Sequence, residues 1–153
     1  MKPYLAKIAA LHTCCNPFFQ DFVLLFLRIT IGWTFFLSGK GKLVNFDRTT
    51  SFFADLNIPA PAFNAGLVGY TEMVGGLLLV AGLGTRLASI PLIITMVVAY
   101  LTEDLKKVFS SISKFTDQAP FIFLCVTLVT LAFGPGRASL DAVIGRFCKC
   151  CKS

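Results

Sequence analysis

The chain has 153 residues, of which 56% are hydrophobic and 14% are charged, and its formal net charge is +6. A soluble domain carries about a quarter charged residues, so this composition, with a mean hydropathy of +0.76, indicates a membrane protein. The basic residues flank apolar runs, where lipid headgroups attract them. The sequence therefore predicts one membrane domain, residues 1–153, that contacts the lipid bilayer and does not bind nucleic acid.

Four apolar runs, at about 22–43, 62–83, 86–102 and 118–134, have roughly the 20-residue length of a transmembrane helix. They do not alternate polar and apolar residues as barrel strands do. The end of the first run carries Lys40 and Lys42, and no small-residue cleavage site of a signal peptide follows it, so we expect this run to be retained. The predicted fold is all-α, a membrane-embedded four-helix transmembrane bundle.

Three flanking segments, at about 3–13, 104–114 and 139–145, are expected to form short interfacial helices. The first two carry apolar residues on one face and lysines beside them. Asn16-Pro17 is expected to end the first, and Ser139 is expected to cap the third.

Four spans place both termini on one side of the membrane. Lys and Arg are almost equally divided between the two sides, so the positive-inside rule gives little preference. We expect a multi-pass protein of the plasma (inner) membrane with cytoplasmic termini.

Arg28 and Glu72 are the most informative ionisable residues, because both lie well inside predicted spans. Such residues are costly in lipid and usually face the bundle interior in pairs. Counted at 1.5 Å per residue from a shared interface, their depths differ by only about 7 Å. We therefore expect Arg28 to pair with Glu72. The pair has two equally favoured interpretations, a structural ion pair that docks two helices and a site for a proton or a quinone headgroup.

Other residues complete this candidate ligand site or pack the helices. Trp33 and Tyr100 have flat rings that can stack on a ligand, although packing and interfacial anchoring are commoner roles. Lys42 can extend to the headgroups or join the polar site. Small residues recur at helix-packing spacing in the first two spans and indicate close backbone contact: Gly32, Gly39, Gly69, Gly75 and Gly76.

Five cysteines near the termini form a candidate thiol cluster: Cys14, Cys15, Cys148, Cys150 and Cys151. Their C-x-C-C spacing matches no standard zinc pattern, and the chain has one histidine, so we expect no metal site. Reduced thiols, a thiol relay and lipid attachment remain open for this cluster.

The order of several short motifs resembles the DoxX family over about 22–146. The first span has Leu27-Arg28, Gly32-Trp33, Gly39 and Lys42-Leu43, and a Phe52-Phe53 to Ile58-Pro59-Ala60-Pro61 stretch follows it. The second span carries Gly69, Glu72, Gly75-Gly76, Gly82 and Thr85-Arg86, and the tail carries Gly134-Pro135-Gly136-Arg137 and Ser139-Leu140-Asp141. Many relatives have histidines where this chain has Ser38 and the 100–103 stretch.

The resemblance implies a four-helix membrane protein of a family in which some members are associated with thiosulfate:quinone oxidoreductase and others with thiol and oxidative-stress complexes. We therefore expect a small subunit or quinone-interacting partner of a thiol or sulfur redox system. Catalysis, if any, would be that of a quinone-linked membrane oxidoreductase, with quinone as cofactor and a redox subunit or a second copy as partner. The alternatives are a non-catalytic assembly, chaperone or lipid-handling module, and a thiol sensor that uses the terminal cysteines.

Overall fold

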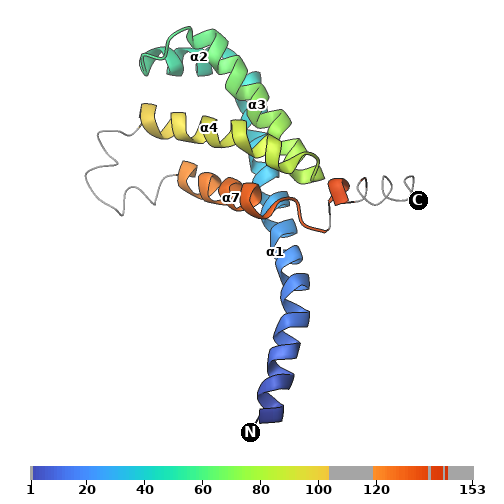
Figure 1. Ribbon diagram of the computed structural model, residues 1–153. Helices are drawn as coiled ribbons and strands as arrows, with labels where there is room; N and C mark the ends of the chain where they lie inside the picture. Colours follow the sequence, from blue (N-terminus) through green and yellow to red (C-terminus); the bar gives the residue numbers. More distant parts are fainter. Residues whose placement is uncertain (1, 104–118, 138, 143, 145–153) are drawn as a thin grey trace.

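A computed structural model describes residues 2–103, 119–137, 139–142 and 144, with the backbone alone for residues 2–18. Its helices are α1 (Lys2–Val44), α2 (Phe46–Asp55), α3 (Pro61–Ala81), α4 (Thr85–Glu103) and α7 (Ala119–Phe133). Figure 1 shows α3, α4 and α7 gathered around α1, with α2 at one end of this group. Throughout the described part of the chain, regular structure is helical.

Segments of three helices are long and apolar enough to cross a membrane: Phe19–Val44, Pro61–Ala81 and Thr85–Thr102. The fourth, Pro120–Phe133 within α7, is apolar but shorter. The predicted helical membrane bundle is therefore confirmed.

Two local expectations differ from the structure. Helix α1 continues through Asn16 and Pro17, so the predicted break there is wrong. Proline removes one backbone hydrogen bond from a helix, and the hydrogen bonds on either side of it can still form. Helix α2 lies between the first two predicted spans, where no helix was predicted. The expected interfacial helix at 104–114 lies outside the described residues. Of 139–145, the structure describes 139–142 and 144.

Glycines bring the backbones of α1 and α3 into direct contact. A Cβ atom on Gly39 would lie 2.4 Å from the Met73 nitrogen and 2.5 Å from the Gly69 carbonyl oxygen. A Cβ on Gly76 would lie 2.5 Å from the Gly32 carbonyl oxygen. Neither distance is possible for a side chain, so these positions require glycine and fix the register of the two antiparallel helices.

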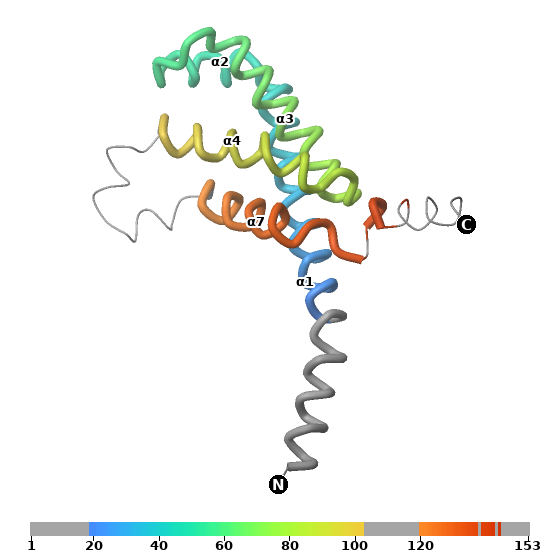
Figure 2. The backbone as a smooth tube through the Cα atoms, in the orientation of Figure 1, coloured from blue at the N-terminus to red at the C-terminus, as the bar shows by residue number. Residues whose placement is uncertain are grey.

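A tight turn joins α3 to α4. Gly82 has a φ of 70°, which glycine adopts without strain, and ends α3. The Gly82 and Leu83 amides both donate to the Leu78 carbonyl, as in a Schellman-type helix end. The turn reverses the chain and places α4 beside α3, as the smooth trace in Figure 2 also shows.

The bundle interior combines a small apolar cluster with hydroxyl contacts. Phe35, Leu79, Leu92 and Met96 are buried together, and the rings of Phe35 and Phe123 lie 4.9 Å apart between centroids. Between α4 and α7, the buried Ser89 and Thr130 hydroxyls lie 3.1 Å apart. Most other large apolar side chains face outward, as expected where lipid is the solvent.

Candidate functional site

The register of α1 against α3 separates Arg28 from Glu72. Gly39 lies against Gly69 and Met73, and Arg28 lies against Gly82, whose Cβ would be 2.8 Å from the guanidinium carbon. Glu72 precedes Gly82 by ten residues on α3, which is about 15 Å along the helix. The predicted Arg28–Glu72 pair is therefore wrong.

The predicted depths of Arg28 and Glu72 assumed that the start of the first apolar run and the end of the second lie at the same membrane interface. The glycine contacts instead shift α1 relative to α3 by about five residues from this predicted alignment. A shift of five residues displaces one side chain by about 7.5 Å along the axis. Each of the two charged residues consequently has its own surroundings.

Arg28 is enclosed by the segment that follows α7. It is 2% exposed and donates a hydrogen bond to the Pro135 carbonyl oxygen. A Cβ on Gly82 would also lie 2.8 Å from the Ser139 Cβ, so the turn, the guanidinium and the C-terminal segment are in close contact. Asp141 supplies the opposite charge that acts on Arg28.

Further hydrogen bonds hold this C-terminal segment to the bundle. The Asp141 carboxylate accepts from the Gly84 amide at 3.0 Å, and the Asp141 amide donates to the Gly82 carbonyl at 3.2 Å. The Asp21 carboxylate of α1 accepts from the Arg137 amide at 3.1 Å. Arg28 therefore belongs to a packed structural junction, hereafter the Arg28 junction.

Glu72 instead lies in a polar cluster with two residues of α1. The Lys42 ammonium is 2.5 Å from Glu72 Oε2, and the Ser38 hydroxyl donates to the same oxygen at 2.9 Å. Lys42 also donates to the Ser38 oxygen at 2.8 Å. The Glu72 side chain is 3% exposed and that of Lys42 is 28% exposed, so the cluster connects a buried carboxylate with the surface.

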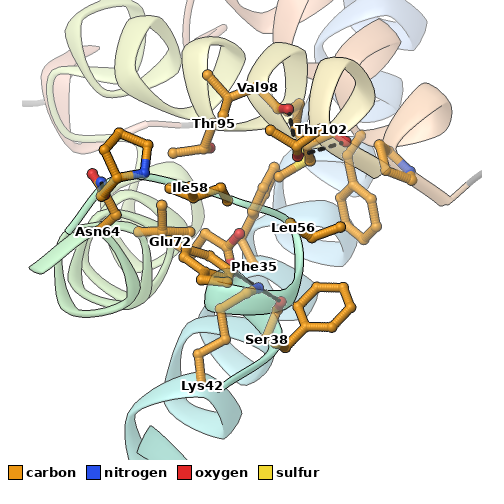
Figure 3. A pocket seen from close by; sticks show the side chains of 18 residues that line it. Phe35, Ser38, Lys42, Leu56, Ile58, Asn64, Glu72, Thr95, Val98 and Thr102 are labelled. Atoms are coloured by element: carbon orange, nitrogen blue, oxygen red, sulfur yellow. Dashed lines mark hydrogen bonds and ion pairs between the residues drawn. The ribbon is translucent and has the colours of Figure 1, made fainter. Parts of the chain in front are cut away.

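These three residues line one wall of a cavity of about 460 Å³. Figure 3 shows Lys42 and Ser38 extending from α1 toward Glu72, with Thr95, Val98 and Thr102 of α4 on another side. The remaining wall residues are mainly apolar and come from α1, α2 with its following loop, α3, α4 and the start of α7: Phe35, Phe52, Phe53, Leu56, Ile58, Pro59, Asn64, Val68, Met96, Ala99, Pro120 and Phe123.

Local backbone geometry forms the part of the cavity beside α2. Asn57 and Ala60 have φ values of 57° and 46°, which turn the chain sharply on both sides of Ile58 and Pro59. The Asn64 amide donates to the Pro59 carbonyl at 2.6 Å and fixes this loop to α3. The loop therefore holds two apolar side chains against the cavity.

The other predicted ligand residues lie outside this wall. Trp33 is 51% exposed and packs on Phe36, with ring centroids 5.3 Å apart, so it faces away from the cavity. Tyr100 is not among the residues that line the cavity. Of the predicted polar site, Glu72 and Lys42 lie together, and Arg28, Trp33 and Tyr100 do not join them.

Ser38 was missed as a site residue. Its signal was its position one helical turn before Lys42, which places both side chains on the same face of α1. A hydroxyl there accepts from Lys42 and donates to Glu72, as described above.

The two N-terminal cysteines of the predicted thiol cluster lie far from the cavity along α1. Cys14 precedes Ser38 by 24 residues on the continuous α1 helix, a separation of about 36 Å. The side chains of Cys14 and Cys15, and the whole of Cys148, Cys150 and Cys151, lie outside the described residues. Cys125 of α7 is a free, exposed cysteine.

The fold defines a helical membrane protein whose interior has a cavity bordered by the Lys42–Glu72 ion pair. Comparison with known sequences gives its family: the DoxX family profile matches residues 23–104. The chain belongs to the DoxX family.

Two bacterial proteins are similar to much of the chain. The chain is 32% identical over 135 residues to "Uncharacterized membrane protein Rv3486" of Mycobacterium tuberculosis, covering 82% of this chain and 83% of that protein. It is 32% identical over 91 residues to "Putative oxidoreductase CatD" of Bacillus subtilis, covering 60% of this chain and 66% of that protein. No solved structure matches the chain.

Proposed function

We propose that this DoxX protein is a quinone-interacting membrane subunit of a thiol or sulfur redox system, and that the cavity beside Glu72 holds the quinone headgroup. The observation that carries the proposal is the ion pair between the part-exposed Lys42 and the buried Glu72, which lies in the wall of an otherwise mainly apolar cavity. The oxidoreductase name of the Bacillus subtilis relative is consistent with it.

The dimensions and chemistry of the cavity suit such a headgroup. Ligand sites usually have volumes of about 300–1,000 Å³, mainly apolar walls and a few convergent polar groups. The cavity has about 460 Å³, and its charged groups gather at Glu72 and Lys42. Aromatic side chains such as Phe35 and Phe53 offer flat surfaces for a ring.

A bound quinone supplies two-electron chemistry that also consumes two protons. The residues of this chain would bind and orient the headgroup and manage one of those protons. Lys42 can donate a hydrogen bond to a carbonyl oxygen. Glu72 can hold or release a proton at its carboxylate, and Ser38 and the part-exposed Lys42 connect it with the surface.

The thiol or sulfur chemistry is assigned to a partner subunit. Cys14 and Cys15 lie about 35 Å or more along α1 from Ser38, too far for direct contact with a headgroup in the cavity. These two cysteines would therefore not deliver electrons directly to the headgroup, and the proposal assigns that role to another protein. This separation also argues against a sensor in which the N-terminal cysteines of the same chain act directly on the cavity ligand.

The test is to extract and identify what co-purifies with the full chain in mild detergent. We expect quinone in near-stoichiometric amount with the wild type and a large reduction in Val68→Phe, because the larger side chain fills the cavity. Leu87→Phe, at an exposed position on α4, is the matched control and should retain the quinone.

Phospholipid in place of quinone, lost in Val68→Phe alone, would favour the lipid-handling alternative. Quinone in equal amounts in all three proteins would show that it dissolves in the micelle and does not occupy the cavity. Either result contradicts the proposed function.

A further inference from the structure

The hydrogen bonds at Glu72 leave a specific part of its carboxylate for a ligand. Ser38 and Lys42 both bind Oε2. Within the described part of the chain, Oε1 accepts no hydrogen bond, although the Glu72 side chain is 3% exposed and lines the cavity. A buried carboxylate oxygen is a strong acceptor that favours an O–H or N–H donor from whatever occupies the space beside it.

Lys42 leaves a complementary donor. An ammonium group has three N–H bonds, and two of those on Lys42 are directed to Ser38 and Glu72. The third is left for a ligand acceptor. The cavity therefore presents an anionic acceptor and a cationic donor side by side.

The threonine hydroxyls elsewhere in the cavity wall already donate hydrogen bonds to backbone carbonyls. Thr95 donates to the Leu92 carbonyl at 2.8 Å, and Thr102 donates to the Val98 carbonyl at 2.9 Å. The Asn64 amide nitrogen donates to Pro59. The selective polar contacts are thus those of Glu72 and Lys42.

We infer that the cavity prefers the hydroxyl-bearing, reduced form of an aromatic lipid headgroup, a hydroquinone, over its oxidised quinone form. A phenolic hydroxyl can donate to Glu72 Oε1 while its oxygen accepts from Lys42. A quinone carbonyl accepts from Lys42 but offers no donor and leaves the carboxylate oxygen unsatisfied. This inference rests on the proposed function and specifies which redox form the site holds.

The preference has a consequence for the bound redox couple. A charge-assisted hydrogen bond is roughly twice as strong as a neutral one, and we expect hydroquinone to bind about tenfold more tightly. For a two-electron couple, tenfold tighter binding of the reduced form raises the midpoint potential by about 30 mV. The bound quinone would therefore accept electrons more readily than quinone in the surrounding membrane.

The experiment compares three probes with the same decyl tail: a benzohydroquinone kept reduced under argon, the matching benzoquinone, and the hydroquinone dimethyl ether. Dissociation constants are measured on the full chain in detergent for the wild type, Glu72→Gln and Val68→Phe. We expect the wild type to bind the hydroquinone about tenfold more tightly than the quinone or the ether. Glu72→Gln should reduce this ratio to about one, and Val68→Phe should weaken all three probes.

The outcomes separate the inference from the function on which it rests. Equal binding of hydroquinone and quinone, or tighter binding of quinone, overturns the inference and leaves quinone binding intact. Binding of none of the probes overturns both. A hydroquinone preference that persists in Glu72→Gln overturns the assignment of Glu72 as the acceptor, provided that the variant keeps the thermal midpoint of a folded protein.

Discussion

The two ends of the α1–α3 pair each contain a buried charged residue, but the surroundings of these residues differ. At one end, Arg28 is enclosed by the α3–α4 turn and by the segment after α7, and its guanidinium contacts Gly82 and Pro135. At the other end, Glu72 is equally buried but borders a cavity. A charge within a membrane span is therefore a candidate for ligand binding only where the surrounding helices leave space beside it, as they do at Glu72.

Disturbing the register of α1 against α3, which separates Arg28 from Glu72, should lower the free energy of unfolding most. Gly39→Ala places a Cβ within 2.4 Å of the Met73 nitrogen. Because backbone atoms cannot yield as side chains do, we expect a loss of about 3 kcal/mol or more in the free energy of unfolding. Reversible denaturation in mixed micelles would measure it.

Gly41→Ala is the matched control, since a Cβ there meets no atom within 4 Å. We expect it to be neutral or to stabilise the helix by up to about 1 kcal/mol. Equal effects of the two substitutions would contradict the glycine-fixed register.

Substitutions in the Arg28 junction should cause the next largest loss in the free energy of unfolding. Arg28→Met removes the charged hydrogen bond to the Pro135 carbonyl and the attraction to Asp141, so we expect a loss of about 2–3 kcal/mol. Arg28→Lys keeps the charge and should lose less. Limited proteolysis would check that the C-terminal segment is released in Arg28→Met, and unchanged cleavage would contradict this role.

Glu72→Gln should have a smaller effect on stability, about 1 kcal/mol. The glutamine retains an oxygen for Ser38, and Lys42, which is 28% exposed, can turn to solvent. Thermal unfolding without ligand would measure the change. A loss as large as that of Arg28→Met would mean that Glu72 is mainly structural.

Loss of a hydroxyl contact between α4 and α7 should lower the free energy of unfolding least. Ser89→Ala removes the hydroxyl contact with Thr130, and such contacts contribute about 0.6 kcal/mol on average in membrane bundles. Thr34→Val is the control, because its hydroxyl bonds within α1 on an exposed face. The same unfolding assay applies, and a larger loss in Thr34→Val than in Ser89→Ala would contradict the assignment.

The sequence predicted the membrane bundle and indicated Glu72 as a candidate site residue, but it did not predict the residue that pairs with Glu72. Hydropathy locates a span to within several residues, whereas an ion pair depends on a register of one residue or two. The glycines that set this register were recognised as packing residues, yet which glycine faces which backbone atom follows only from the three-dimensional contacts. The choice between Arg28 and Lys42 was therefore beyond the sequence.

The cavity was also beyond the sequence for a physical reason. Its walls combine α1, α3 and α4 with the loop after α2 and the start of α7, so residues such as Phe53 and Phe123 meet only in the folded chain. Helix α2 itself is amphipathic and short, and it follows α1 after only Asn45. Trp33 had the chemistry of a ligand-stacking residue, but its side of α1 faces outward.

The most direct test of the contrast between the two ends is the affinity for decyl-benzohydroquinone, measured in parallel on the wild type, Arg28→Met and Glu72→Gln. The structure predicts that Arg28→Met binds within about twofold of the wild type, despite its lower stability, and that Glu72→Gln binds about tenfold more weakly. Weaker binding in Arg28→Met with unchanged binding in Glu72→Gln would contradict the assignment of the ligand site to Glu72.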